Sequence, residues 1–219
     1  MARKLDYDQI VLNIEFLLIS VIQGVAFSTL LGYAAPIINN GQTEYWLYIT
    51  AGFLIVLVFW SHAIIHALSF IDWPLDLFHS FLYFLVIFFQ VLSLSQMTNP
   101  LHWFITTVCT FLVAWFLYVW DYFLIKKHEK AYSISAEKKK LYTHIVKRHL
   151  FEMNLLIPAG LFTNIISLIL IVWRPRLFLD AHLHIALISL QVLFILGMLG
   201  NAIDSFKKRA YLISACLES

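Results

Sequence analysis

The sequence predicts an all-α integral membrane protein, a bundle of six transmembrane helices with both termini in the cytoplasm. Of its 219 residues, 61% are hydrophobic and only 13% are charged, a composition that nearly excludes a water-soluble domain. No Lys or Arg occurs between Lys4 and Lys126. A soluble surface would not tolerate so long a gap between basic residues, so the chain is expected to lie in lipid.

Six apolar runs are long enough to cross the hydrocarbon core of a bilayer, which takes about 20 helical residues. Helices are favoured because lipid cannot satisfy the backbone polar groups of an open sheet. We expect residues 1–219 to form a single transmembrane domain with a basic connection at 126–148. The expected spans are approximately 10–32, 45–70, 77–97, 102–125, 149–173 and 181–203.

The placement of Lys and Arg predicts the orientation in the membrane. With six spans, 13 of the 15 basic residues fall on one side and only Arg174 and Arg176 fall on the other. Because basic loops stay in the cytoplasm, that side is predicted to be cytoplasmic. The plasma (inner) membrane is the expected location.

The basic connection has two interpretations. Its cations are suited to contact either anionic lipid headgroups or an acidic cytoplasmic protein partner. Nucleic-acid binding is not supported, because the basic residues lie at the membrane surface without a domain to present them. The candidate contact residues are Lys138, Lys139, Lys140, Lys147 and Arg148.

A stripe of small side chains follows the first predicted helix, at Ser20, Gly24, Ser28 and Gly32. Small residues at every fourth position let two helices approach closely in lipid. The stripe therefore predicts a helix-packing seam. The partner helix belongs either to the same chain or to a second copy, and we expect a homo-oligomer.

Polar residues gather at the predicted cytoplasmic ends of all six helices. His62 and His66 share a helix face, and the predicted turn at 72–76 brings His79 close to His66. Ionisable groups inside a membrane are costly and usually functional, whereas in the headgroup region they cost little. The candidates for a pathway or sensor are His62, His66, His79, Glu15, Asp121, Asn154, Asn201 and Asp204.

Three interpretations of His62 and His66 remain open. The imidazoles could make structural hydrogen bonds, act as a proton relay or pH sensor, or bind a metal or haem together with His79. The HxxxH spacing is similar to the first histidine box of membrane desaturases and hydroxylases. The further HxxHH-type boxes that those di-iron enzymes need are absent from the sequence.

No strong catalytic motif occurs in the sequence, so the leading interpretation is a non-enzymatic protein. We expect a small channel- or sensor-type subunit involved in ion transport, with no cofactor. One alternative is a membrane enzyme that uses haem, iron or zinc and acts on a lipid or quinone. Another is a scaffold or effector subunit of a complex with a cytoplasmic partner.

Overall fold

The computed structural model describes the backbone of residues 2–69, 76–127, 129 and 136–218. It describes their side chains except at 2–12, 15, 67–69, 137 and 215–218. The turn predicted at 72–76 lies outside the described residues apart from Asp76. The elements are α1 (Ala2–Asn39), η1 (Thr43–Tyr45), α2 (Trp46–Ser69), α3 (Leu77–Leu94), α4 (Pro100–Lys127), α5 (Ala136–Phe151), η3 (Glu152–Leu156), α6 (Ile157–Trp173), η4 (Arg176–Asp180) and α7 (His184–Glu218).

Six helical segments within the described residues are long and apolar enough to cross a membrane, which confirms the predicted all-α polytopic fold. Two helices extend well beyond the predicted spans. The 38 residues of α1 and the 35 residues of α7 continue past the apolar window as helix. The apolar pattern marks where lipid ends, whereas the helix continues because its backbone hydrogen bonds also form in water.

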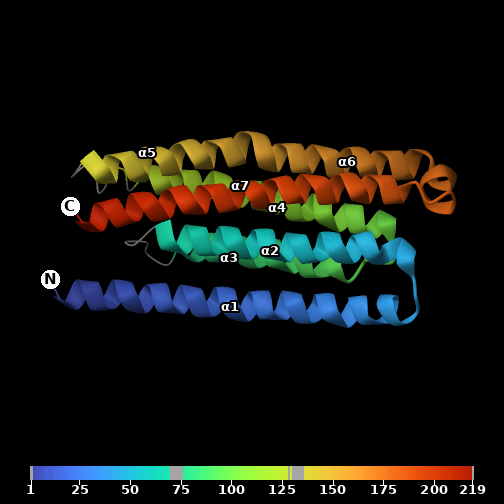
Figure 1. Ribbon diagram of the computed structural model, residues 1–219, viewed down its shortest axis with the longest axis horizontal. Helices are drawn as coiled ribbons and strands as arrows, with labels where there is room; N and C mark the ends of the chain where they lie inside the picture. The colour runs from blue at the N-terminus through green and yellow to red at the C-terminus, as the bar shows by residue number, and fades with distance from the viewer. Residues whose placement is uncertain (1, 70–75, 128, 130–135, 219) are drawn as a thin grey trace.

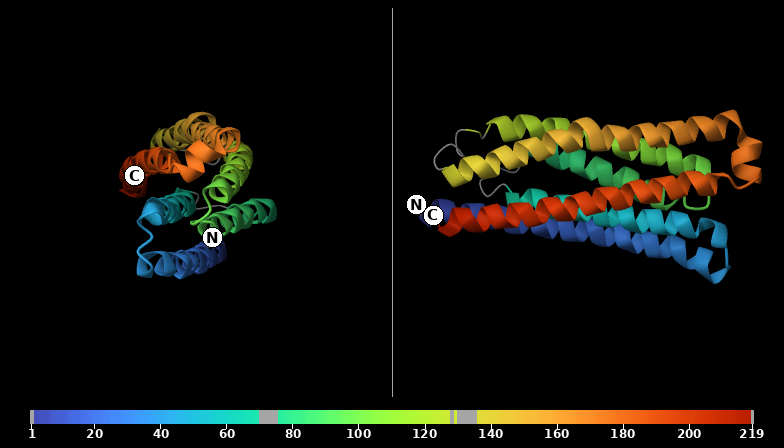
Figure 2. Two further views of the ribbon diagram at one scale, coloured as in Figure 1. Left: turned by 90° about the vertical axis from the view of Figure 1, so that its right-hand side faces the viewer. Right: turned by 45° about the horizontal axis from the view of Figure 1, so that its top comes forward.

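The helices lie roughly parallel in an elongated bundle (Figure 1). The start of α1 and the end of α7 are at the same end, which also holds α5 (Figures 1 and 2). That shared end agrees with the predicted topology, in which its basic residues lie on the cytoplasmic side. Neighbouring pairs include α3 with α4, α2 with α7, α4 with α6, and α1 with both α2 and α3.

A π-helical turn, η3, joins α5 to α6 in one continuous helical segment. In η3, the backbone N–H of Ile157 donates to the carbonyl of Glu152, five residues earlier. The turn directly precedes Pro158, whose ring cannot donate to an α-helical ladder. Single π turns are common at functional sites, and this one begins at a buried carboxylate.

A small apolar cluster anchors the cytoplasmic extension of the bundle. Ile125 of α4 packs with Leu141, Tyr142 and Ile145 of α5, and residues of α7 cover them. Burying these side chains holds α5 against the ends of α4 and α7. Along the chain, the polar site residues Arg148, His149 and Glu152 follow shortly after the α5 residues of this cluster.

The small-residue stripe lies on the outer face of α1. Ser20, Gly24, Ser28 and Gly32 are all exposed, and a Cβ added at either glycine would meet nothing within 4 Å. Within the described residues the stripe therefore makes no packing seam with this chain. The homo-oligomer stays a prediction, in which the exposed stripe would pack against a second copy of the chain.

Candidate functional site: a buried cluster of histidines and carboxylates

Asp121 of α4 is shared by two histidines from neighbouring helices. Its Oδ1 lies 2.7 Å from Nδ1 of His79, and its Oδ2 lies 3.3 Å from Nε2 of His66. The two imidazole rings stack with their centroids 5.2 Å apart. Because Asp121 is almost fully buried, these histidines are the main groups that compensate its charge.

Asp76 fixes the geometry of this unit. It caps the N-terminus of α3 by accepting from the backbone N–H of His79 at 2.8 Å. Its Oδ2 also accepts from Nε1 of Trp120 at 2.6 Å. Trp120 directly precedes Asp121. The carboxylate of Asp76 therefore fixes the backbone at His79 and the side chain next to Asp121, and so helps to hold these two residues in contact.

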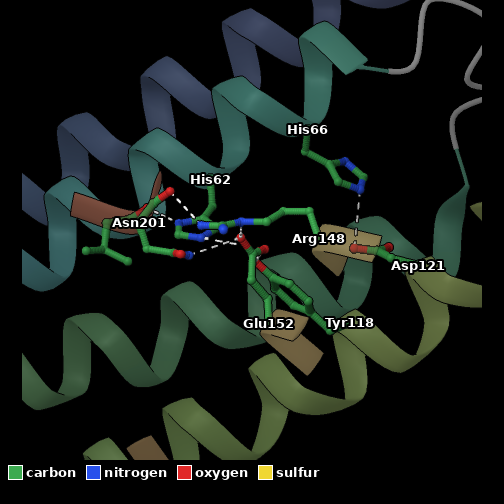
Figure 3. A network of polar contacts seen from close by, with 8 residues as sticks. His62, His66, Tyr118, Asp121, Arg148, Glu152 and Asn201 are labelled. Atoms are coloured by element: carbon green, nitrogen blue, oxygen red, sulfur yellow. Dashed lines mark hydrogen bonds and ion pairs between the residues drawn. The ribbon is translucent and has the colours of Figure 1, made fainter. Parts of the chain in front are cut away.

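Glu152 is the centre of a second unit, built from four helices (Figure 3). Its Oε1 accepts from Nε of Arg148 at 3.1 Å, and its Oε2 accepts from the hydroxyl of Tyr118 at 3.3 Å. The side-chain amide of Asn201 lies 3.5 Å from Oε1. Nε2 of His62 faces Oε2 at 3.9 Å, so the carboxylate connects α2, α4, α5 and α7.

The backbone contact of His62 determines which of its nitrogens is protonated. Nδ1 lies 2.8 Å from the carbonyl oxygen of Val58, which can only accept, so Nδ1 must donate. In the neutral ring Nε2 then carries a lone pair, which is repelled by the carboxylate of Glu152. The contact becomes attractive only when Nε2 also holds a proton.

Arg148 lies inside the bundle. Besides its bond to Glu152, its guanidinium donates to the backbone carbonyl of Asn201 at 2.6 Å, which ties α5 to α7. The structure thus assigns Arg148 to the site, although the sequence grouped it with a surface. Lys138, Lys139, Lys140 and Lys147 are exposed, and their contact with lipid or a partner stays a prediction.

Several residues of the site were not singled out from the sequence. Nε2 of His149 donates to the carbonyl of Tyr118 at 2.8 Å, and the two rings stack at 5.0 Å. Arg209 of α7 is buried and interacts electrostatically with Glu152. A signal existed for two of them, because Tyr118 lies three residues before Asp121 and His149 lies three residues before Glu152.

Some of the predicted residues lie elsewhere. Asn154 and Asp204 are exposed, and Asp204 pairs with Lys208 at 3.0 Å on the outside of α7. The side chain of Glu15 lies outside the described residues. The structure therefore brings together His62, His66, His79 and Asp121, with Asn201 at the edge, and adds Glu152. We call His62, His66, His79, Asp121 and Glu152 the His/carboxylate cluster.

The His/carboxylate cluster lines one partly open cavity of about 160 Å³. Apolar side chains such as Phe59 and Leu117 form much of its wall. Beyond the cluster it reaches polar side chains deeper in the bundle, among them Tyr83, Gln90 and Thr110. The two carboxylates and their histidines are therefore connected through one shared space.

The fold and the site together define a polytopic α-helical protein of membrane-spanning type, with ionisable groups buried near the end of the bundle that holds both termini. Comparison with protein-family models, curated proteins and solved structures finds no match for this chain. Among the described residues, no group of three or more His, Cys, Asp or Glu side chains is placed to hold a metal ion. The three histidines are divided between two carboxylates, and a haem, iron or zinc cofactor stays a prediction.

Proposed function

We propose that the protein is a proton-responsive membrane protein of the channel or sensor type. In this proposal the His/carboxylate cluster takes up protons from the cytoplasm. The observation that carries the proposal is the sharing of buried Asp121 by His66 and His79, at 3.3 and 2.7 Å. Histidine is the side chain whose ordinary titration falls near neutral pH.

The charges around the cluster support reversible proton binding. Asp121 faces His66 and His79, with His149 nearby, and it has no Arg or Lys in direct contact among the described residues. Protonating one imidazole therefore neutralises a buried negative charge. Glu152 differs because Arg148 already compensates it, and a proton on His62 would add a further positive charge there.

The supporting geometry suits a switch between two charge states. His66 and His79 stack in parallel against one carboxylate, so two protonated rings would repel each other while sharing a single counter-ion. Proton uptake at Asp121 thus changes the forces between α2, α3 and α4, the helices that supply the three groups.

Equilibrium proton uptake by the purified protein in nanodiscs tests this proposal. Between about pH 7.5 and pH 5.5 we expect Asp121→Asn to bind roughly one proton fewer per chain than wild type, since the amide cannot stabilise an imidazolium. Asp204→Asn is the matched control, because Asp204 is an exposed carboxylate at the same end of the bundle. Equal uptake by wild type and both variants would refute the proposal.

A further inference from the structure

One face of α3 follows the cavity away from the His/carboxylate cluster. His79, Tyr83, Gln90 and Leu94 are spaced so that they share this face. The first three line the cavity. At 1.5 Å per residue, His79 and Gln90 are separated by roughly 16 Å along the helix axis. The cavity therefore extends from the cytoplasmic cluster far into the membrane.

Gln90 lies near the deep end of this space. Its side chain is only 1% exposed, yet neither its Oε1 nor its Nε2 has a hydrogen-bond partner among the described residues. Leaving buried polar atoms unpaired is energetically costly. Gln191, also buried, bonds through its Oε1 to Trp103 and through its Nε2 to Asn164. The contrast indicates that Gln90 bonds to something that occupies the cavity.

Water fits this cavity better than an alkyl chain does. A volume of about 160 Å³ has room for several waters, and although much of the wall is apolar, it also presents polar side chains to which water can bond. Thr107 and Thr110 line this one, and each donates its hydroxyl hydrogen to a backbone carbonyl. Their oxygens therefore still accept bonds from water, whereas an alkyl chain would satisfy neither them nor Gln90.

Beyond Ser93, which also lines the cavity, the packing around α3 becomes apolar and tight. Leu94, Met97 and Leu30 are fully or almost fully buried and converge on Gly52 of α2. A Cβ built on Gly52 would lie 2.7 Å from Leu94 and 3.2 Å from both Leu30 and Met97. We call these four residues the outer gate, because apolar packing of this kind excludes water.

We infer that the cavity is a water-filled half-channel for protons, open toward the His/carboxylate cluster and closed on the outer side by the outer gate. Protons suit it better than metal cations, which need several oxygen ligands around them. Here Ile55, Ile195 and Met198 also line the cavity and offer no oxygen. This inference deepens the proposed function and rests on it, because the cluster supplies the protons.

Proton flux into proteoliposomes tests the gate. With sodium as the only other cation, Leu94→Ser should raise the proton flux roughly tenfold by admitting water to the constriction, without a sodium flux. Leu190→Ser is the matched control, because Leu190 is an exposed leucine of α7 and should leave the flux at the wild-type level. The double variant Gln90→Leu/Leu94→Ser should return toward wild type. A Leu94→Ser flux equal to that of the control, or a matching sodium flux, would overturn the inference.

Water-edited solid-state NMR on the unmodified protein provides a test that does not depend on folding of a variant. The side-chain amide of Gln90 should show transfer from water, and Gln191, which is bonded within the protein, should not. Transfer to Gln90 from lipid acyl protons instead would identify an acyl chain and overturn the half-channel. If proton uptake still depends on Asp121, such a result leaves the proposed function standing.

Discussion

At the scale of a single residue, Arg148 shows that a cation next to a basic surface segment can be a buried structural contact instead of a surface charge. The sequence places it at the end of a basic segment, next to Lys147, where both read as surface cations. In the structure Lys147 is exposed, whereas Arg148 donates to Glu152 and to the carbonyl of Asn201. The sequence could not distinguish them, because depth along a helix does not specify which way a side chain faces.

Removing the guanidinium should therefore destabilise the protein strongly. Arg148→Ala leaves the buried carboxylate of Glu152 without the cation that contacts it directly, and breaking such a buried pair costs about 3–5 kcal/mol. Lys147→Ala should alter the free energy of unfolding by less than about 0.5 kcal/mol. Unfolding of both variants in the same detergent measures the difference, and equal stabilities would show that Arg148 does not hold the site together.

Asp76 is a second residue whose role appears only in three dimensions. Asp76→Ala removes the cap of α3 and the acceptor for Trp120, so we expect a loss of about 1–2 kcal/mol in stability. It should also loosen the His79–Asp121 contact and reduce proton uptake. Asp76→Asn retains an oxygen acceptor and should recover most of both losses. Loss of stability with unchanged proton uptake would mean that the cap does not position His79.

At the scale of elements, close approach between α4 and α6 depends on Gly160. A Cβ built there would overlap the ring of Phe111, which lines the cavity. The π turn just before Pro158 sets the rotation of α6 relative to α5. Helical periodicity in the sequence does not reveal such a turn.

Gly160→Ala should consequently destabilise the bundle by about 1–3 kcal/mol, the usual cost of overpacking. Gly200→Ala is the matched control, because a Cβ at this helical glycine of α7 would meet nothing within 4 Å. It should be neutral or slightly stabilising, since alanine favours helix. Thermal unfolding of the two variants makes the comparison, and a stable Gly160→Ala protein would show that α4 and α6 can separate freely.

At the scale of the whole molecule, composition and charge were enough to predict the architecture. Apolar length and the need to satisfy the backbone in lipid leave helices as the economical solution, and the structure has six such candidate spans in its described residues. The grouping of His62, His66, His79 and Asp121 followed from their common depth. Glu152 also belongs to the cluster, whereas Asn154 and Asp204, predicted at a similar depth, face outward. The sequence could not separate them, because the rotation of each helix about its axis is set by packing.

The topology itself is testable by labelling from outside intact cells. In a background without Cys109 and Cys216, Gln42→Cys should react with a membrane-impermeant maleimide, because it lies in the predicted outer connection between α1 and α2. Lys139→Cys should react only after the membrane is opened, because it lies in the basic connection. The reverse pattern would place the His/carboxylate cluster on the outer side.

The most direct test of proton binding is ¹⁵N NMR of the histidine rings in lipid. We expect His79 or His66 to carry protons on both nitrogens at about pH 6, since each contacts buried Asp121. The imidazolium signal should disappear in Asp121→Asn, while His102, exposed at the other end of the bundle, titrates unchanged. Neutral rings at both positions from about pH 7.5 to 5.5 would contradict a proton-responsive cluster.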